Sequence, residues 1–334
     1  MIGAGVMGAD HANIISEDVP GAVLQVVCDA CEATARRVAE ACGSLDLSTD
    51  AAETIRRDDV DAVLIASPDQ THTELTLAAL DLNKPVLCEK PLAISANEAL
   101  SVIEAECAIG RQMVQVGFMR RFDPSYAEMK SALVSGQVGN AVMMHNFHRN
   151  VAAPAGFSGM MAITNSAPHE FDVVRWMLDT EILAISAFEP AVVNDDACNP
   201  VFIVMEASRG QLVTIEVNNN ASYGYDVRGE LVGTEGSIGL AGPAATRIDK
   251  NLRSGTNYAA DWRPRFREAY RLQNKAWIKS IATGVSATNA ANAWDGYCAS
   301  VIAEAGVAAL SSSGKVAVEL EQRPALYAAG KDAA

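Results

Sequence analysis

The sequence predicts an α/β protein with two domains, in which a doubly wound parallel sheet is followed by an α+β domain with a large, open, mostly antiparallel sheet. Three observations support this fold class. Over the first third of the chain, short apolar runs alternate with helix-like stretches, which is typical of a parallel sheet covered on both faces. Strand-like segments then follow one another directly. A length of 334 residues is enough for two hydrophobic cores.

The first domain is expected to span residues 1–118. Gly, Asn or Lys-Pro closes each helix-like stretch in this part of the chain, and such residues mark the turns between elements. We therefore expect parallel strands at 23–29, 61–67, 85–88 and 113–117, separated by helices at 31–42, 73–82 and 95–109.

The second domain is expected to span residues 119–334, where helices and strands no longer alternate. Val213, Ile215 and Val217 alternate with polar residues, which predicts a sheet whose other face is solvated or covered by a partner. The expected helices lie at 124–135, 167–178, 263–283 and 294–312, and the expected strands at 140–148, 182–188, 201–207, 211–218, 226–232 and 237–240.

Charge and hydropathy exclude several classes of protein. The net charge of −15 and a pI near 4.8 would repel a phosphate backbone, so we expect no nucleic-acid partner. No apolar run approaches the roughly 18 residues that span a bilayer. The sequence contains no basic stretch followed by an apolar one, so we do not expect a secretory leader. We therefore expect a cytoplasmic protein with no membrane partner.

Cysteine spacing argues against a metal site. Cys28 and Cys31 form a C-x-x-C pair, but no second pair accompanies them as a structural zinc site requires. We expect reduced thiols and no metal. The seven cysteines lie at positions 28, 31, 42, 88, 107, 198 and 298.

A glycine-rich stretch near the start predicts a dinucleotide-binding turn. Residues Gly3 to Gly8 have the G-x-G-x-x-G spacing, and a helix-like stretch follows, whose first N–H groups would bind a pyrophosphate. Asp29 ends the next predicted strand, where a carboxylate binds the ribose hydroxyls and repels a 2′-phosphate, so NAD is favoured over NADP. Only Met1 and Ile2 precede the turn, so we expect that most of a first strand is missing.

Two further stretches carry residues suited to catalysis. Lys90 follows a predicted strand at its carboxyl end, where parallel sheets bind ligands, and its ammonium would stabilise a reacting oxygen. His169 lies near the start of a predicted helix and has the ordinary pKa range of a general base. Asp172 is three residues further, on the same helical face, where it would orient His169 or contact a substrate.

Together these stretches resemble the Gfo/Idh/MocA oxidoreductases and, within that family, the inositol 2-dehydrogenase subgroup. The resemblance covers nearly the whole chain. It is carried by the motifs GAGVMG, EKPLA, GFMRRFDPSY, HRN, NSAPHEFDVVRW, YGYDVRGELVGTEGSI, ADWRPRF and AWDGY, together with Asp29. It implies an N-terminal Rossmann domain and a C-terminal domain whose open sheet builds the substrate pocket and a homotetramer.

The resemblance also implies which residues contact the cofactor. The loop after the strand at 61–67 would border the nicotinamide ribose. His11, one helical turn after Met7, is instead expected to be structural. The implied cofactor contacts are Gly3, Gly5, Val6, Met7, Gly8, Asp29, Ser67, Pro68, His72, Glu89 and Lys90.

The resemblance implies that Lys90 is the catalytic lysine and that His169 accepts the hydroxyl proton. One position departs from the family pattern, because Asn165 stands where an aspartate is usual. An amide still donates and accepts hydrogen bonds to a polyol but cannot relay a proton. The implied substrate contacts are Arg121, His148, Asn150, Asn165, Asp172 and Tyr225.

These implications predict NAD-dependent oxidation of a cyclic polyol, myo- or scyllo-inositol, to a ketone. Two alternatives stay open. A pyranose or aldose dehydrogenase of the same family would meet a similar fan of ring hydroxyls. A non-catalytic NAD-sensing protein would share the fold without the reaction, because fold does not fix function.

Overall fold

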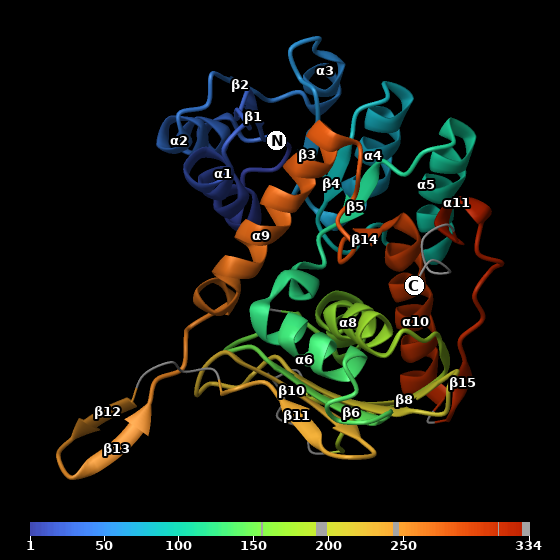
Figure 1. Cartoon of the computed structure of the whole chain (residues 1–334). Helices are drawn as coiled ribbons and strands as arrows, with labels where there is room; N and C mark the ends of the chain where they lie inside the picture. Colours follow the sequence, from blue (N-terminus) through green and yellow to red (C-terminus); the bar gives the residue numbers. More distant parts are fainter. Residues whose placement is uncertain (155, 192–198, 243–246, 313, 329–334) are drawn as a thin grey trace. The chain divides into compact units, whose positions relative to one another are not determined.

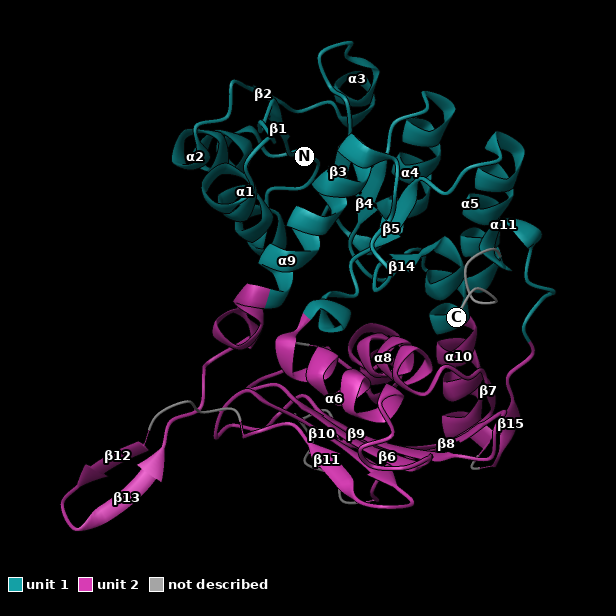
Figure 2. Ribbon diagram, in the orientation of Figure 1, with its two compact units in different colours: residues 1–122, 269–300, 320–334 teal, residues 123–268, 301–319 magenta. Residues whose placement is uncertain are grey.

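The computed structural model describes the chain apart from residues 155, 192–198, 243–246, 313 and 329–334 (Figure 1). The chain packs into two compact units that are not two consecutive segments (Figure 2). Two of their boundaries fall inside helices, one in α9 (Trp262–Thr283) and one in α10 (Ala293–Ser312). Unit 1 contains residues 1–122, 269–300 and 320–334, and unit 2 contains residues 123–268 and 301–319. The assignment of NAD binding to residues 1–118, and of substrate binding and oligomerisation to residues 119–334, stays a prediction.

Unit 1 contains the predicted parallel sheet. Its inner strands are short, and most of their side chains are fully buried, as expected where helices cover both faces. The parallel strands are β1 (Val26–Cys28), β2 (Asp46–Ser48), β3 (Val63–Ile65), β4 (Val86–Cys88) and β5 (Val114–Val116), and β14 (Ala291–Asn292) pairs antiparallel with β5.

The place between β1 and β3 is taken by the first residues of the chain. Ile2 forms parallel bridges to both Cys28 and Ile65. Its N–H donates to the Leu64 carbonyl at 2.8 Å, and its carbonyl accepts the Ala66 N–H at 2.8 Å. Two residues thus occupy the position at which a longer first strand was expected. The glycine turn leaves the sheet directly after them.

The helices of unit 1 begin and end where local chemistry directs them. Ser95 accepts the Glu98 N–H at the start of α5, and the left-handed residues Gly43 and Gly110 end α2 and α5. Predicted helix bounds agree with the structure to within a residue or two. The helices are α1 (Val6–Asp18), α2 (Glu32–Cys42), α3 (Ala51–Arg56), α4 (His72–Asp81), α5 (Ala96–Ile109), the second part of α9 (Trp262–Thr283), the first part of α10 (Ala293–Ser312) and α11 (Ala325–Ala328).

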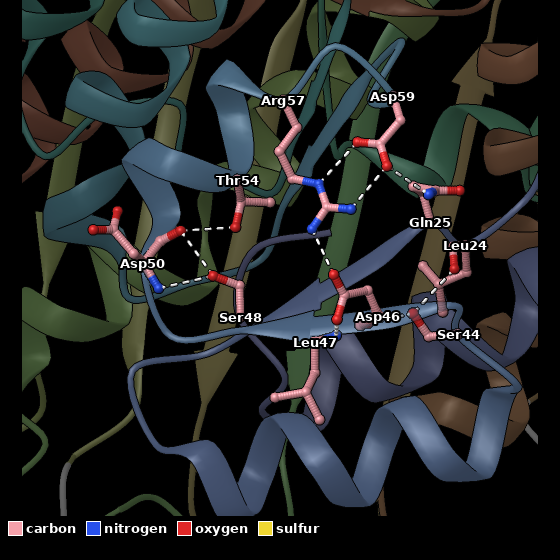
Figure 3. A network of polar contacts seen from close by, with 10 residues as sticks. All are labelled: Leu24, Gln25, Ser44, Asp46, Leu47, Ser48, Asp50, Thr54, Arg57 and Asp59. Atoms are coloured by element: carbon pink, nitrogen blue, oxygen red, sulfur yellow. Dashed lines mark hydrogen bonds and ion pairs between the residues drawn. The ribbon is translucent and has the colours of Figure 1, made fainter.

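A polar network fixes the edge strand β2, which the sequence analysis did not predict (Figure 3). Arg57 donates to Asp46 at 2.6 Å and, through two nitrogens, to Asp59 at 2.8 Å. Hydrogen bonding to the guanidinium lowers the pKa of both carboxyls. Because these side chains are largely solvent-exposed, the network orients the strand edge more than it stabilises the fold.

Unit 2 contains the predicted open sheet. In the part of this unit that the structure describes, the sheet has seven strands, in the order β11-β10-β6-β9-β8-β7-β15, and every pair is antiparallel except β6–β9. The expectation of a mostly antiparallel sheet is confirmed. The strands are β6 (Ala141–Arg149), β7 (Ile182–Phe188), β8 (Val201–Ala207), β9 (Leu212–Asn218), β10 (Asp226–Gly233), β11 (Ser237–Gly239) and β15 (Val316–Ala317).

The two faces of this sheet differ. Helices α6 (Pro124–Val134) and α8 (Pro168–Leu178) lie on one face, where the alternating residues of β9 are fully buried. Among the described residues of unit 2, no helix covers the opposite face (Figure 2). Phe188 and Phe202 pair across β7 and β8 on that face, and they are 50% and 45% exposed. The sheet therefore presents an apolar strip to its surroundings.

Smaller elements escaped prediction because their sequences are polar or very short. The hairpin of β12 (Arg247–Lys250) and β13 (Arg253–Thr256) has every strand residue exposed and lacks a periodic apolar pattern. The helix α7 (Gly159–Met161) and a π-helix at Ala162–Ser166 lead directly into α8.

Candidate active site

The glycine turn is shaped by close backbone approaches. Gly3 has φ of +89°, and a Cβ there would lie 2.4 Å from the carbonyl oxygen of Ala66, at the end of β3. A Cβ on Gly8 would lie 1.9 Å from the carbonyl oxygen of Gly3. Both positions therefore exclude any side chain, which brings helix α1 against the turn.

Gly5 is glycine for a different reason. A Cβ there would meet no protein atom within 4 Å, and Gly5 caps α1 without a side-chain hydrogen bond. The first turn of α1 contains no acidic residue. The N–H groups at a helix start lack partners inside the helix, so the turn offers donors and a partial positive charge beside space for a bulky anion. Val6 and Met7 supply two of these N–H groups.

Asp29 lies just after β1, next to the glycine turn. Its Oδ2 accepts the N–H of Ala4 at 2.8 Å, and its Oδ1 accepts the N–H of Cys31 at 2.9 Å. Each carboxylate oxygen has capacity for a further hydrogen bond. The turn thus holds the carboxylate in a fixed orientation from which it can accept bonds from ribose hydroxyls.

The ends of β3 and β4 lie side by side, because Ile65 pairs with Cys88. Ser67 and Pro68 follow β3, and the Ser67 hydroxyl lies 2.6 Å from that of Thr71. Lys90 follows β4, and the Lys90–Pro91 peptide bond is cis. Carboxyl ends of neighbouring parallel strands form the ligand edge of such sheets, so these residues occupy the position expected of cofactor contacts.

His72 ties these two strand ends together. It is 1% exposed, with Nδ1 at 2.6 Å from the Pro91 carbonyl and Nε2 at 2.9 Å from the Ser67 carbonyl. Two acceptors are best satisfied by a doubly protonated ring. Burial opposes that charge, but Cys88 and the two carbonyls raise the pKa of His72 to about 10. Its direct contact with a cofactor stays a prediction.

Three aromatic rings gather in unit 2. His169 lies in the first turn of α8, His148 near the end of β6, and Tyr225 just before β10. The ring centre of His148 is 6.3 Å from that of His169 and 6.3 Å from that of Tyr225. All three are buried. The fold therefore brings together three of the predicted site residues from three separate elements.

A carboxylate that the sequence analysis did not single out orients His148. Glu170 is fully buried, and its Oε2 lies 3.0 Å from Nδ1 of His148. This contact favours a proton on Nδ1 and fixes the orientation of the ring. Glu170 stands next to His169 in the sequence, but no local pattern indicates that it reaches a strand 22 residues earlier.

The π-helix positions the residues that precede His169. The N–H of Ala167 donates to the carbonyl of Ala162, five residues back, at 3.0 Å. Such turns are rare in proteins, and those that occur are often found at functional sites. Asn165 lies within the π-helix and is partly exposed, whereas Asp172, one turn after His169, is 1% exposed.

Asn150 lies just after β6 and is connected to the same helical segment. Its amide donates to the side-chain oxygen of Asn219 at 2.6 Å, and that oxygen also accepts the Ser166 hydroxyl at 3.2 Å. Asn150 therefore lies beside the end of the π-helix, within unit 2.

Arg121 belongs to unit 1, where it forms an ion pair. Its guanidinium lies 3.2 Å from the carboxylate of Asp295, at the start of α10, and the arginine is only 5% exposed. Its carbonyl accepts a hydrogen bond from Asn289 at 3.1 Å. A role in substrate binding stays a prediction, and Asp295, which the sequence analysis missed, is a partner that fixes Arg121.

The parallel sheet, the close-packed glycine turn and the carboxylate after β1 define a dinucleotide-binding protein. The sequence profile of the oxidoreductase family with an NAD-binding Rossmann fold matches residues 1–118, and that of the GFO/IDH/MocA C-terminal domain matches residues 126–239. The chain is 44% identical to inositol 2-dehydrogenase 1 of Saccharopolyspora erythraea, over 98% of both chains. It is 40% identical to inositol 2-dehydrogenase of Streptomyces avermitilis, over 98% of this chain and 96% of that one.

Among solved structures, myo-inositol dehydrogenase from Lactobacillus casei in complex with NAD(H) and myo-inositol superposes with a TM-score of 0.92 at 28% identity, over 98% of both chains. The chain belongs to the GFO/IDH/MocA family of oxidoreductases. Its cofactor is NAD, and the residues present fit it: donors at the start of α1, space over Gly5 and the carboxylate of Asp29.

Among the described residues, no group of three or more His, Cys, Asp or Glu side chains is arranged to hold a metal ion. Nor does any helix in the described parts of the chain have the length and apolar character needed to cross a membrane.

Proposed function

We propose that this chain oxidises a ring hydroxyl of an inositol to a ketone. The similarity to inositol 2-dehydrogenases covers 98% of this chain. The observation that carries the proposal is the buried cluster of His169, His148 and Tyr225 in unit 2, which offers a base beside two further polar side chains for a polyhydroxylated ring.

The oxidation removes a hydride and a proton from the carbinol group of the substrate. When bound, NAD supplies the acceptor for the hydride that leaves the carbinol carbon. His169 accepts the hydroxyl proton, because an imidazole nitrogen can act as a general base near neutral pH. Lys90 donates a hydrogen bond to the reacting oxygen and so stabilises negative charge as the proton leaves. The products are a ketone, NADH and a proton.

The remaining predicted contacts serve binding. His148, oriented by Glu170 at Nδ1, presents Nε2 to substrate hydroxyls as a hydrogen-bond partner. Asn150 and Asp172 supply an amide and a carboxylate, which together accept and donate hydrogen bonds to a polyol. A polyol site needs such partners because each unpaired buried hydroxyl would weaken binding. Arg121 and Tyr225 are proposed as further contacts.

A spectrophotometric screen tests the proposal. NAD or NADP is mixed with the enzyme and with a series of inositol isomers and aldoses, and the absorbance of NADH or NADPH is followed. We expect reduction of NAD with an inositol. Reduction with aldoses alone would indicate a pyranose dehydrogenase, and NAD binding without any reduction would indicate a sensor.

Asn165 is proposed as a determinant of substrate range. The variant Asn165→Asp restores a carboxylate four residues before His169. We expect it to remain active while the set of accepted ring isomers changes, because an amide and a carboxylate differ in the hydrogen bonds they donate. A rise in kcat on every substrate would instead identify the asparagine as an impaired proton relay.

A homotetramer is proposed, assembled through the uncovered face of the unit 2 sheet. That face carries the apolar strip of Phe188 and Phe202, and exposed apolar strips mark interfaces. Light scattering should give a tetramer mass, and Phe202→Glu should reduce it. Leu82→Glu is the control, because Leu82 is also 45% exposed but belongs to unit 1. A monomer mass for the unmodified protein would refute the proposal.

We also propose a cytoplasmic location. Of the seven cysteines, Cys198 lies outside the described residues, and the other six form no disulfide in the described structure. Reduced thiols are expected in that compartment. Fractionation of cells that express the protein tests this point.

A further inference from the structure

A buried chain of polar contacts runs through unit 1 from helix α1 to Lys90. His11 lies on α1, one turn after Met7, and is 0% exposed. Its Nε2 is 2.9 Å from Oε1 of Glu89, and Oε2 of the same carboxylate accepts the backbone N–H of Lys90 at 3.1 Å. One carboxylate thus contacts both the helix that begins at the glycine turn and the backbone of Lys90.

The far side of the imidazole is fixed as well. Nδ1 of His11 lies 3.2 Å from the side-chain oxygen and 3.0 Å from the side-chain nitrogen of Asn274, on α9. Tyr270 packs edge-on against the ring, with centroids 5.5 Å apart. An amide offers both a donor and an acceptor, so Asn274 satisfies the ring in either protonation state. The imidazole therefore has one orientation.

The position of Glu89 also depends on a missing side chain. A Cβ built on Gly117, just after β5, would lie 2.8 Å from the carboxyl carbon of Glu89 and 2.8 Å from Oε1. Glu89 is itself 5% exposed. The sheet thus leaves this space for the carboxylate alone, and a buried carboxylate so placed is costly unless its oxygens are bonded.

We propose that His11 is a positioning residue for Lys90. His11 holds Glu89, and Glu89 holds the backbone of Lys90, so the residue that touches the reacting oxygen takes its place from the helix whose first turn binds the cofactor phosphates. The inference rests on the proposed role of Lys90. It gives a function to a histidine that the sequence analysis expected to be only structural.

The test compares kcat, KM for myo-inositol and Kd for NAD in variants of the full-length enzyme. His11→Leu leaves the carboxylate without its partner, and we expect kcat to fall by about 10- to 100-fold, as for other misplaced catalytic groups. KM and Kd should change by less than about threefold. His11→Gln keeps an N–H for Glu89 and should restore most of kcat.

Glu106→Gln provides the matched control. Glu106 is another fully buried carboxylate of unit 1, and it accepts bonds from the N–H groups of Met113 and Val114 and from the Tyr327 hydroxyl. We expect this variant to lower Tm while kcat stays at the wild-type value. If Glu106→Gln instead loses as much kcat as His11→Leu for the same loss of Tm, the loss in His11→Leu reflects stability alone and the proposal is overturned.

A second variant covers the case in which His11→Leu fails to fold. Asn274→Leu loosens the imidazole without unpairing Glu89, and a kcat loss of several-fold is expected. Full kcat in a folded Asn274→Leu or His11→Leu enzyme contradicts the positioning role. Lys90→Ala separates the role of Lys90 from that of His11: if this variant keeps wild-type kcat, the proposed role of Lys90 fails, whereas a loss of kcat there together with a fully active His11→Leu refutes only the positioning role.

Discussion

In unit 1, the turn expected to bind the cofactor takes its shape largely from glycines, which lack side chains. In unit 2, the residues expected to bind substrate are buried polar side chains. Gly3 and Gly8 exclude a Cβ because backbone atoms lie closer than a Cβ allows. His148 and His169, by contrast, come from a strand and a helix that are separate in the sequence, and Glu170 contacts the ring of His148.

The difference separates two kinds of sensitivity to substitution. A turn built on close backbone approaches tolerates no added atom, so its defects appear as lost stability as well as lost binding. A cluster of buried polar groups keeps its fold when one partner is trimmed conservatively, so its defects appear mainly in turnover. The predictions below separate or test these two behaviours.

The largest expected effect is on turnover. His169→Ala removes the proton acceptor, so kcat should fall by roughly 10²- to 10⁴-fold, the usual contribution of a general base. Kd for NAD, measured by fluorescence titration, should hardly change, because the NAD-binding turn belongs to unit 1. His145→Ala is the control, since His145 lies on β6 with its ring against Thr214 on the uncovered face. Full activity in His169→Ala would remove the mechanism.

Gly8 and Gly5 of the turn should respond differently to substitution. Gly8→Ala places a Cβ against the Gly3 carbonyl, so the free energy of unfolding should fall by about 1–3 kcal/mol, the cost of overpacking. Gly5→Ala meets no protein atom, so its Tm should stay near the wild-type value while Kd for NAD rises about tenfold, or ~1.4 kcal/mol. Equal losses of Tm in the two variants would show that the open space at Gly5 has no special role.

Asp29 tests cofactor choice. Asp29→Ala removes the acceptor for the ribose hydroxyls, and each charged hydrogen bond contributes about 1.5–3 kcal/mol. The ratio of kcat/KM for NAD to that for NADP should therefore fall roughly 10- to 100-fold. Because the carboxylate also holds the Ala4 N–H, Tm should fall slightly. An unmodified enzyme that already prefers NADP would contradict this assignment.

The smallest expected effect concerns pH. The pKa of His72 is raised to about 10, so its charged form stabilises the folded state fully below the ordinary histidine pKa of about 6.5, and this contribution is lost as the pH rises toward 10. His72→Gln should lower stability by about 1.5 kcal/mol at pH 6. The difference between the two proteins should shrink by pH 10. A difference in Tm that is constant across this range would contradict the charged ring.

Much of unit 1 could be predicted because the sequence signals that determine its elements are local. The glycine spacing, the aspartate after the next strand and the helix-ending glycines each act within a few residues, and the structure confirms the fold they predict. The edge strand β2 was missed because Asp46–Ser48 is short, polar and partly exposed, and its place is fixed by Arg57 rather than by an apolar pattern.

Among the proposed site residues of unit 2, local patterns indicated only His169 and Asp172, and the others were implied by the resemblance. His148 and Glu170 meet through tertiary packing, and neither the strand pattern nor the helix pattern contains that pairing. The same holds for Arg121 and Asp295, which are 174 residues apart in the sequence. The π-helix was also missed, since an extra residue within a helical turn leaves the apolar spacing around it nearly unchanged.

The return of the chain to unit 1 has a consequence for how the protein is made. His11 finds its partner Asn274 only 263 residues later. At about 5–20 residues per second, a ribosome needs roughly 13 to 50 seconds to deliver that partner. Tyr327, which reaches the buried Glu106, is synthesised later still. The half of the enzyme that emerges first is thus completed last, and throughout that interval the growing chain exposes the apolar surfaces that chaperones bind.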